Sequence, residues 1–182
     1  MVAVTVLHVG GQLAPLEVAA AALQEAFGGV RVKPGKGVEH AHAVAEALRA
    51  AGCQEHIQVV GLLHDVVEDT PWTPARVRKR FGKRVAVLVA ALTEDAGIAD
   101  YRTRKRALRT QIVRAGPDAI DVALADKVAT LTYALSHDKR VPKRKFAHYQ
   151  ALLQASEDEA GHAVLRARVG ELLALVTNRR PD

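Results

Sequence analysis

Four ionisable side chains lie inside the most apolar stretch of this sequence. The segment Leu62–Asp69 reads Leu-Leu-His-Asp-Val-Val-Glu-Asp, so that His64, Asp65, Glu68 and Asp69 follow directly on a run of aliphatic residues. Burying an unpaired carboxylate is costly, and such groups persist in a core only when they are paired, hydrogen bonded or bound to a metal ion. In a continuous helix, residues four apart share one face, as His64 and Glu68 would. The spacing therefore predicts a polar site built into a buried helix.

Two further positions show the same mismatch between residue type and surroundings. Asp126 lies in the apolar run Val122–Val128, and His40 and His42 begin another amphipathic segment. Each of these residues alone has an ordinary explanation as a cap, an ion-pair partner or a hydrogen-bonded core residue. The combination of an adjacent His-Asp pair, acids one turn later, a histidine upstream and an aspartate downstream favours one shared site.

The elements that must position these residues are predicted to be helices. Ala is abundant and aromatic residues make up 4% of the chain, which favours closely packed helices over a β-sandwich. Apolar periodicity and Gly or Pro breaks predict helices over 15–27, 39–51, 54–67, 74–82, 83–93, 101–114, from 117 to a break at Val141-Pro142, 143–155 and 159–177. Thr73 is the expected N-cap before Pro74. Alternating valines predict a short extended piece over 2–9, and 31–38 and 95–100 are expected to be loops.

Bulk properties predict one domain over residues 1–182, with a core of about 16–153 and an amphipathic C-terminal helix over about 159–178. The single cysteine, Cys53, excludes an internal disulfide and favours a reducing cytoplasm. No apolar run reaches the roughly 20 residues that span a bilayer, and the N-terminus lacks the basic region of a signal peptide. The C-terminal helix either covers the core or forms a contact in an oligomer.

The net charge of +6 is concentrated in clusters. The clusters comprise Arg76, Arg78, Lys79, Arg80, Lys83 and Arg84, then Arg102, Arg104, Lys105, Arg106 and Arg109, then Lys139, Arg140, Lys143, Arg144 and Lys145. Solvated helix faces are one explanation, and a positive field that attracts a polyphosphate or a nucleic acid is the other. Composition leaves both open.

The combined pattern resembles the HD-domain phosphohydrolases of the RelA/SpoT hydrolase branch, which include small alarmone hydrolases of the metazoan SpoT homologue type. The resemblance rests on Glu39-His40, Leu63–Thr70 and Leu124–Lys127, with supporting matches at Arg80–Gly82 and Ala115–Ala119. It covers about residues 16–153, and HDxxED with correctly spaced flanking motifs is a specific signal. It implies an all-α, compact multi-helix HD-domain bundle. The implied activity is metal-dependent release of pyrophosphate from guanosine 3′,5′-bis(diphosphate).

The resemblance also implies roles for individual residues. The implied ligands of one divalent ion are His40, His64, Asp65 and Asp126. Manganese is the expected ion, and iron and zinc are compatible with the same mixed nitrogen and oxygen donors. Glu68 and Asp69 would orient and deprotonate the attacking water. The implied substrate-binding residues are Arg31, Lys33, Arg104, Lys105, Lys127 and Thr130.

Departures from the family pattern fall in the substrate-binding part. Thr130 occupies the position at which alarmone hydrolases carry an asparagine, and Tyr133 stands close to a usual threonine. Gly37-Val38 and Ala41 replace an aromatic-proline loop and a proline. The residues implied for the metal and the water are intact, whereas those implied for substrate recognition differ.

Three hypotheses remain open at this point. The first is an alarmone-type pyrophosphohydrolase, and the second is an HD phosphohydrolase that acts on a different nucleotide. The third is a non-catalytic module that binds a nucleotide, RNA or a protein partner. Retention of Glu68 and Asp69 argues against the third, because a pure binding module needs no base.

Overall fold

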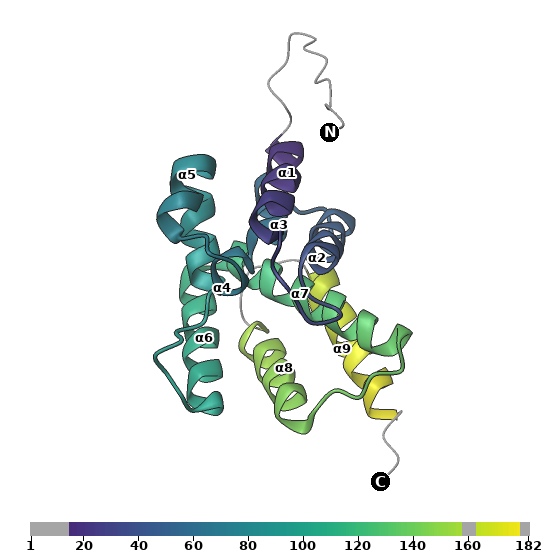
Figure 1. The fold of residues 1–182 in the computed structure, drawn as a ribbon. Helices are drawn as coiled ribbons and strands as arrows, with labels where there is room; N and C mark the ends of the chain where they lie inside the picture. Colours follow the sequence, from purple (N-terminus) through teal and green to yellow (C-terminus); the bar gives the residue numbers. More distant parts are fainter. Residues whose placement is uncertain (1–14, 158–162, 179–182) are drawn as a thin grey trace.

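The computed structural model describes residues 15–157 and 163–178, and all the regular secondary structure in this part of the chain is helical (Figure 1). The helices are α1 (Pro15–Phe27), α2 (Val38–Ala50), α3 (Glu55–Leu63), α4 (Val66–Asp69), α5 (Pro74–Leu92), α6 (Tyr101–Ala115), α7 (Pro117–Ser136), α8 (Lys143–Ala155) and α9 (Ala163–Asn178). The all-α prediction is confirmed. The extended piece expected at 2–9, and the predicted start of the last helix at 159, lie outside the described residues. None of the described helices has the length and hydropathy of a membrane span.

The predicted N-cap of α5 and the predicted interruption at Gly82 are confirmed. The Thr73 side chain accepts a hydrogen bond from the backbone N–H of Arg76, and Pro74 takes the first helical position. Gly82 has φ 84° and ψ 174°, a conformation that interrupts the helix. The two predicted helices over 74–82 and 83–93 are therefore the two arms of one kinked element.

The predicted helix over 54–67 is wrong in one respect, because α3 ends at Leu63 and the short α4 begins at Val66. Between them, Asp65 adopts φ −95° and ψ −3°, at the margin of the helical region. The Gly61 carbonyl, which a continuous helix would pair with the Asp65 N–H, lies 2.8 Å from His64 Nδ1. His64 and Asp65 thus lie at a junction between two helices, not on one helical face. Similarly, α7 ends at Ser136, ahead of the Val141-Pro142 break that was expected to end it.

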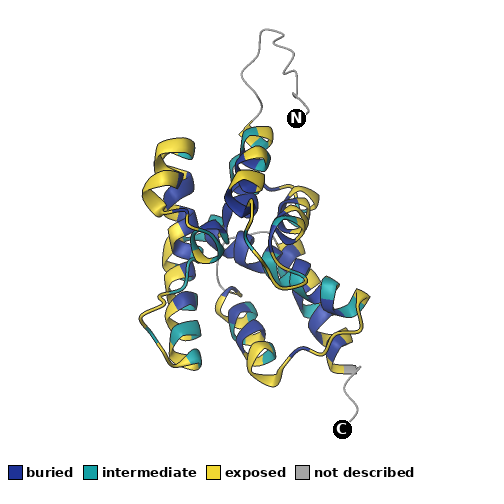
Figure 2. Cartoon of the chain, viewed as in Figure 1, coloured by how far each residue is buried: buried dark blue, intermediate teal, exposed yellow. Residues whose placement is uncertain are grey.

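Helices α3 and α7 form the interior of the fold, and both are dark blue along much of their length in Figure 2. Helix α3 contacts α1, α2, α5 and α7, while α7 also contacts α6, α8 and α9. Gly61 lets α2 approach α3 closely, since a Cβ there would lie 2.6 Å from Leu48 Cδ1. This close approach matters for the site, because α2 carries His40 and α3 leads into His64.

Replacing Leu48 by alanine is expected to lower the free energy of unfolding by about 2–5 kcal/mol. Leu48 is fully buried, and Gly61 opposite it has no side chain that could fill the space. Leu175→Ala provides the matched control, because Leu175 is 49% exposed, and a change of about 0.5 kcal/mol or less is expected. Urea denaturation measures both. Equal stability of the two variants would contradict the packing of α2 on α3.

Candidate metal centre

Two histidines and two aspartates from three places in the sequence meet where α2, the α3–α4 junction and α7 come together. His40 Nε2 lies 3.1 Å from Asp126 Oδ1, and His64 Nε2 lies 3.2 Å from Asp65 Oδ1. The two imidazole centroids are 5.4 Å apart. Potential ligand atoms of His40, His64 and Asp65 all lie within 4.8 Å of one another, and Asp126 joins this group through His40. The structure therefore brings together all four residues implied as ligands.

The histidine nitrogens fit a metal ion. Both Nε2 atoms are buried, and neither makes a hydrogen bond, although each lies near a carboxylate. His64 Nδ1 faces the Gly61 carbonyl and donates to it, which leaves Nε2 as the atom able to bind a cation. An unsatisfied buried polar atom costs about 1–3 kcal/mol. One cation between two imidazoles and two carboxylates would satisfy all of these groups.

Protons and ammonium groups balance the charge of this cluster. Burial lowers the pKa of His64, but the neighbouring Asp65 carboxylate outweighs it and raises this pKa to about 9. A metal ion at Nε2 must therefore displace a proton. Lys127 Nζ contacts Asp126 Oδ2, and Lys36 Nζ lies 2.9 Å from Asp65 Oδ2. Against the effect of burial, Lys127 and His40 hold the pKa of Asp126 well below its usual range. Both aspartates are thus kept ionised, which is the state in which a carboxylate binds a cation.

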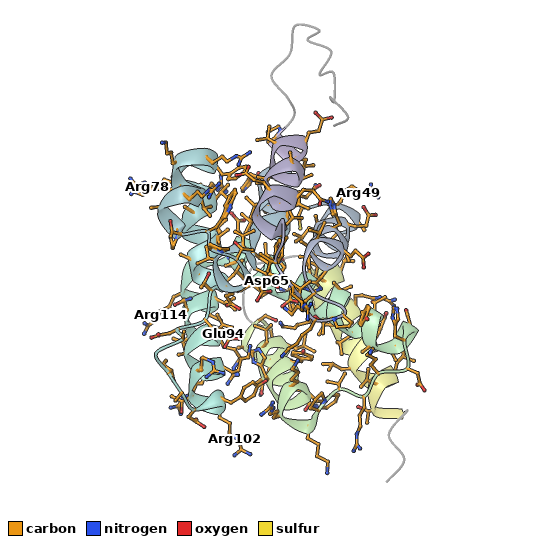
Figure 3. The ribbon with its side chains drawn as sticks, viewed as in Figure 1. Arg49, Asp65, Arg78, Glu94, Arg102 and Arg114 are labelled. Atoms are coloured by element: carbon orange, nitrogen blue, oxygen red, sulfur yellow. The ribbon has the colours of Figure 1, made fainter. Side chains whose placement is uncertain are left out.

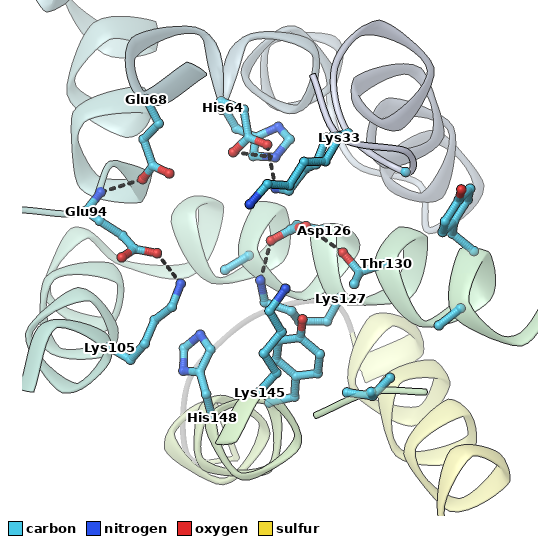
Figure 4. Close-up of a pocket in the computed structure, with 18 of the residues that line it drawn as sticks. Lys33, His64, Glu68, Glu94, Lys105, Asp126, Lys127, Thr130, Lys145 and His148 are labelled. Carbon is cyan, nitrogen blue, oxygen red and sulfur yellow. Dashed lines mark hydrogen bonds and ion pairs between the residues drawn. The ribbon is translucent and has the colours of Figure 1, made fainter. Parts of the chain in front are cut away.

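Glu68 and Asp69 lie on α4, immediately after the His-Asp pair. Glu68 Oε1 accepts a hydrogen bond from the backbone N–H of Glu94 at 2.5 Å, as Figure 4 shows. Burial and the negative charge of Asp65 raise the pKa values of both Glu68 and Asp69. A carboxylate with a raised pKa beside a cation site is suited to accept a proton from water.

A cavity of about 700 Å³ opens in front of this cluster, and we call it the main cavity. Asp65, Asp126, Glu68 and Asp69 all contribute to its wall. Figure 4 shows lysines from the 31–37 loop, α6, α7 and α8 converging on it. Its lining includes every residue implied for substrate binding, namely Arg31, Lys33, Arg104, Lys105, Lys127 and Thr130.

Several of these residues already form ion pairs or hydrogen bonds with other residues of the protein. Arg104 and Lys105 both bind the Glu94 carboxylate, and Arg104 also donates to the Ile98 and Ala99 carbonyls. The Thr130 hydroxyl donates to Asp126 Oδ1 at 3.1 Å. Thr130 therefore supports a candidate metal ligand in addition to facing the cavity.

Sequence reasoning missed several polar residues of this wall, among them Lys36, Glu94, Tyr101, Lys145 and His148. Lys145 lies in a basic cluster of the sequence, and Lys36 stands four residues before His40, so position offered a signal for these two. Glu94, Tyr101 and His148 lie in or beside helices whose sequence shows only amphipathic or basic character.

Replacing Asp126 by asparagine is expected to weaken Mn²⁺ binding by more than about tenfold, because an anionic donor becomes neutral. Asp118→Asn provides the matched control on the same helix, since Asp118 pairs with Arg84 and His56 away from the main cavity. Isothermal titration of purified protein with Mn²⁺ measures both affinities. Wild-type affinity in the Asp126 variant would contradict its assignment as a ligand.

Comparison with known proteins agrees with this geometry. The chain is 34% identical over 96 residues to the guanosine-3′,5′-bis(diphosphate) 3′-pyrophosphohydrolase MESH1 of Drosophila melanogaster, and 36% identical over 96 residues to its Homo sapiens counterpart. Each match covers 52% of this chain and 53% of the relative, so this chain spans about half the length of the relatives it matches. A solved structure, described as a metazoan orthologue of SpoT that hydrolyses ppGpp, has the same fold, with a TM-score of 0.73 at 24% identity over 92% of this chain and 98% of that one. Residues 16–154 match the HD domain family model, and the chain therefore belongs to the HD domain family.

Proposed function

We propose that this protein is a metal-dependent pyrophosphohydrolase that removes the 3′-diphosphate from guanosine 3′,5′-bis(diphosphate). The observation that carries the proposal is the convergence of His40, His64, Asp65 and Asp126 beside two carboxylates with raised pKa values, at the wall of a cation-rich cavity. The names of the Drosophila and human relatives specify this activity and support it. Cys53, the single cysteine of the sequence, is buried, which fits the cytoplasm that we propose as the site of action.

When bound, the divalent ion supplies positive charge that polarises a phosphoryl oxygen and acidifies water. We propose manganese, with iron and zinc as alternatives. The residues of the chain perform the remaining tasks. Glu68 or Asp69 takes a proton from the attacking water, whose oxygen forms a bond to the phosphorus attached to O3′. The bond between that phosphorus and O3′ breaks, O3′ gains a proton, and pyrophosphate leaves. Lys105 and Lys127 line the cavity where they can balance the charge of the phosphates.

A second candidate is hydrolysis of a different nucleotide, and the position of Thr130 favours it. The Thr130 hydroxyl donates its one hydrogen to Asp126, so it has none to donate to a substrate, whereas the family asparagine carries an amide with two donor hydrogens. A panel of nucleotides with Mn²⁺ separates the candidates. Pyrophosphate release from guanosine 3′,5′-bis(diphosphate) supports the first, and cleavage of another nucleotide alone replaces it with the second. Salt-sensitive RNA binding without any turnover would instead indicate a binding module.

Replacing Glu68 by glutamine is expected to lower kcat by about 10²–10⁴-fold while Mn²⁺ affinity stays unchanged. The amide keeps the shape of the side chain but cannot accept the proton, and the hydrogen bond of the Glu68 carboxylate runs to the Glu94 backbone rather than to a candidate ligand. Glu46→Gln is the control, because Glu46 pairs with Arg49 on the exposed face of α2. Steady-state kinetics and Mn²⁺ titration are measured on the same preparations. Equal loss of metal in the Glu68 and Asp126 variants would remove the distinction between base and ligand.

The activity is expected to fall as the pH is lowered through the pKa of Glu68. Burial raises this pKa above the ordinary value for glutamate of about 4.3, so the neutral carboxyl persists to higher pH and the base is available only above that point. In a profile of kcat against pH at saturating Mn²⁺, kcat should fall on the acidic side. The midpoint of this acid limb should lie above the ordinary pKa of glutamate. The residual activity of Glu68→Gln should lack the limb, and an unchanged limb would assign it to another group.

A further inference from the structure

A second hollow of about 570 Å³ adjoins the main cavity between α6 and α8, and we call it the α6–α8 groove. Tyr101, Lys105 and His148 line both the main cavity and the groove, so the two hollows lie next to each other and share these side chains. The groove also contains Arg102, Arg109, Lys143 and Arg144, and no acidic residue lines it. It was not anticipated as a site from the sequence, in which these residues belong to two separate basic clusters.

The positive charge of the groove is not balanced by the protein. Neither α6 nor α8 contains a single acidic residue. Lys105 pairs with Glu94, but Arg102, Arg109, Lys143 and Arg144 form no ion pair with any residue that the structure describes. Burial and the nearby Arg106 lower the pKa of Arg109, as expected for a cation held close to another cation. Such an arrangement attracts an anion.

Two polar atoms of the groove lack partners. His148 is 5% exposed, and its Nδ1 lies 3.0 Å from Arg109 Nη1. Because a guanidinium can only donate, Nδ1 accepts and Nε2 carries the hydrogen, and that buried Nε2 has no acceptor. Figure 4 shows the His148 ring at the floor of the cavity, beside Lys105. The Tyr101 hydroxyl is also buried without a partner, and the Arg144 guanidinium lies 5.0 Å from the centre of its ring.

The His148 ring is held neutral. Burial, together with the positive charges of Lys127, Lys105 and Arg109, lowers its pKa to about 3. It therefore offers a neutral N–H donor among cations, a combination that suits an anionic ligand with several oxygen atoms. One phosphate group could accept from His148 and be neutralised by the neighbouring arginines.

We propose that the α6–α8 groove binds the second polyphosphate arm of the substrate, the one that is not cleaved. This inference rests on the proposed function, in which the substrate carries a diphosphate at both the 3′ and the 5′ position. The 3′ arm is hydrolysed at the metal centre, and the 5′ arm needs cations of its own. The groove supplies them next to the main cavity, and no bond is made or broken there.

The test compares two substrates in matched variants. Arg144→Gln should raise KM for guanosine 3′,5′-bis(diphosphate) about tenfold with kcat unchanged, because a charge-assisted contact to the 5′ arm is lost. KM for guanosine 3′-diphosphate, which lacks the 5′ arm, should not change. Arg114→Gln is the control, because this substitution removes the same charge from an exposed arginine of α6 that lies outside both hollows. Figure 3 shows it on the outer side of the helix.

His148 provides an independent variant pair. His148→Leu should raise KM for the two-armed substrate, and His148→Gln, whose amide N–H can replace the Nε2 donor, should restore most of the affinity. Rescue by glutamine distinguishes donation to substrate from a purely structural role in packing. If KM for the one-armed substrate rises as much as KM for the two-armed substrate, or if Arg114→Gln matches Arg144→Gln, the groove does not bind the 5′ arm.

A binding measurement separates this inference from the proposed activity. Titration of metal-free protein with guanosine 5′-diphosphate requires no turnover. Weaker binding to Arg144→Gln than to Arg114→Gln supports the groove even if no substrate is hydrolysed, in which case only the proposed activity fails. Equal affinities of the two variants refute the groove even if hydrolysis is observed.

Discussion

The burial of charge at one helix crossing is the constraint on which this structure depends. Two imidazoles and two carboxylates lie where α2, α7 and the α3–α4 junction meet, in a protein whose interior is built mainly from Leu, Val and Ala. Ionised groups in such a place must be paired with opposite charge. The contacts around them satisfy this requirement, with Lys36 on Asp65 and with Lys127 and Thr130 on Asp126.

The same constraint accounts for local features that helix propensity does not. A continuous α3 would place His64 and Asp65 at ordinary helical positions, whereas the break after Leu63 sets both at the end of one helix and the start of another. The Gly61 carbonyl then orients the His64 ring, and the absence of a side chain at Gly61 lets α2 bring His40 within range. One glycine thus serves both the packing of α2 on α3 and the geometry of the site.

The helical fold and the candidate ligands could be predicted from the sequence. The helices follow from the spacing of apolar residues, and the ligands are polar residues that interrupt apolar runs. Asp126 and the His-Asp pair stand out in runs of Val, Leu and Ala, and Gly82 and Thr73 mark helix ends through local backbone chemistry. The break after Leu63 could not be predicted, since it depends on tertiary pairing of the groups that flank it. Glu94 and His148 were missed for a similar reason, because their contacts with Arg104 and Arg109 form only when the elements that carry them pack together.

The main cavity divides its tasks between two walls. The α4 wall presents Glu68 and Asp69, whose raised pKa values suit proton transfer, and the α6 and α8 wall presents cations and neutral donors. Glu94 links the walls, because its backbone N–H donates to Glu68 while its carboxylate binds Lys105. The side chains that contact the candidate ligands directly are Lys36, Lys127 and Thr130, and all three lie outside α6 and α8, so substitution of the α6 and α8 cations leaves these contacts in place. Thr130 lies outside this wall, on α7, and its hydroxyl donates to Asp126, so its departure from the family asparagine acts on the ligand cluster itself.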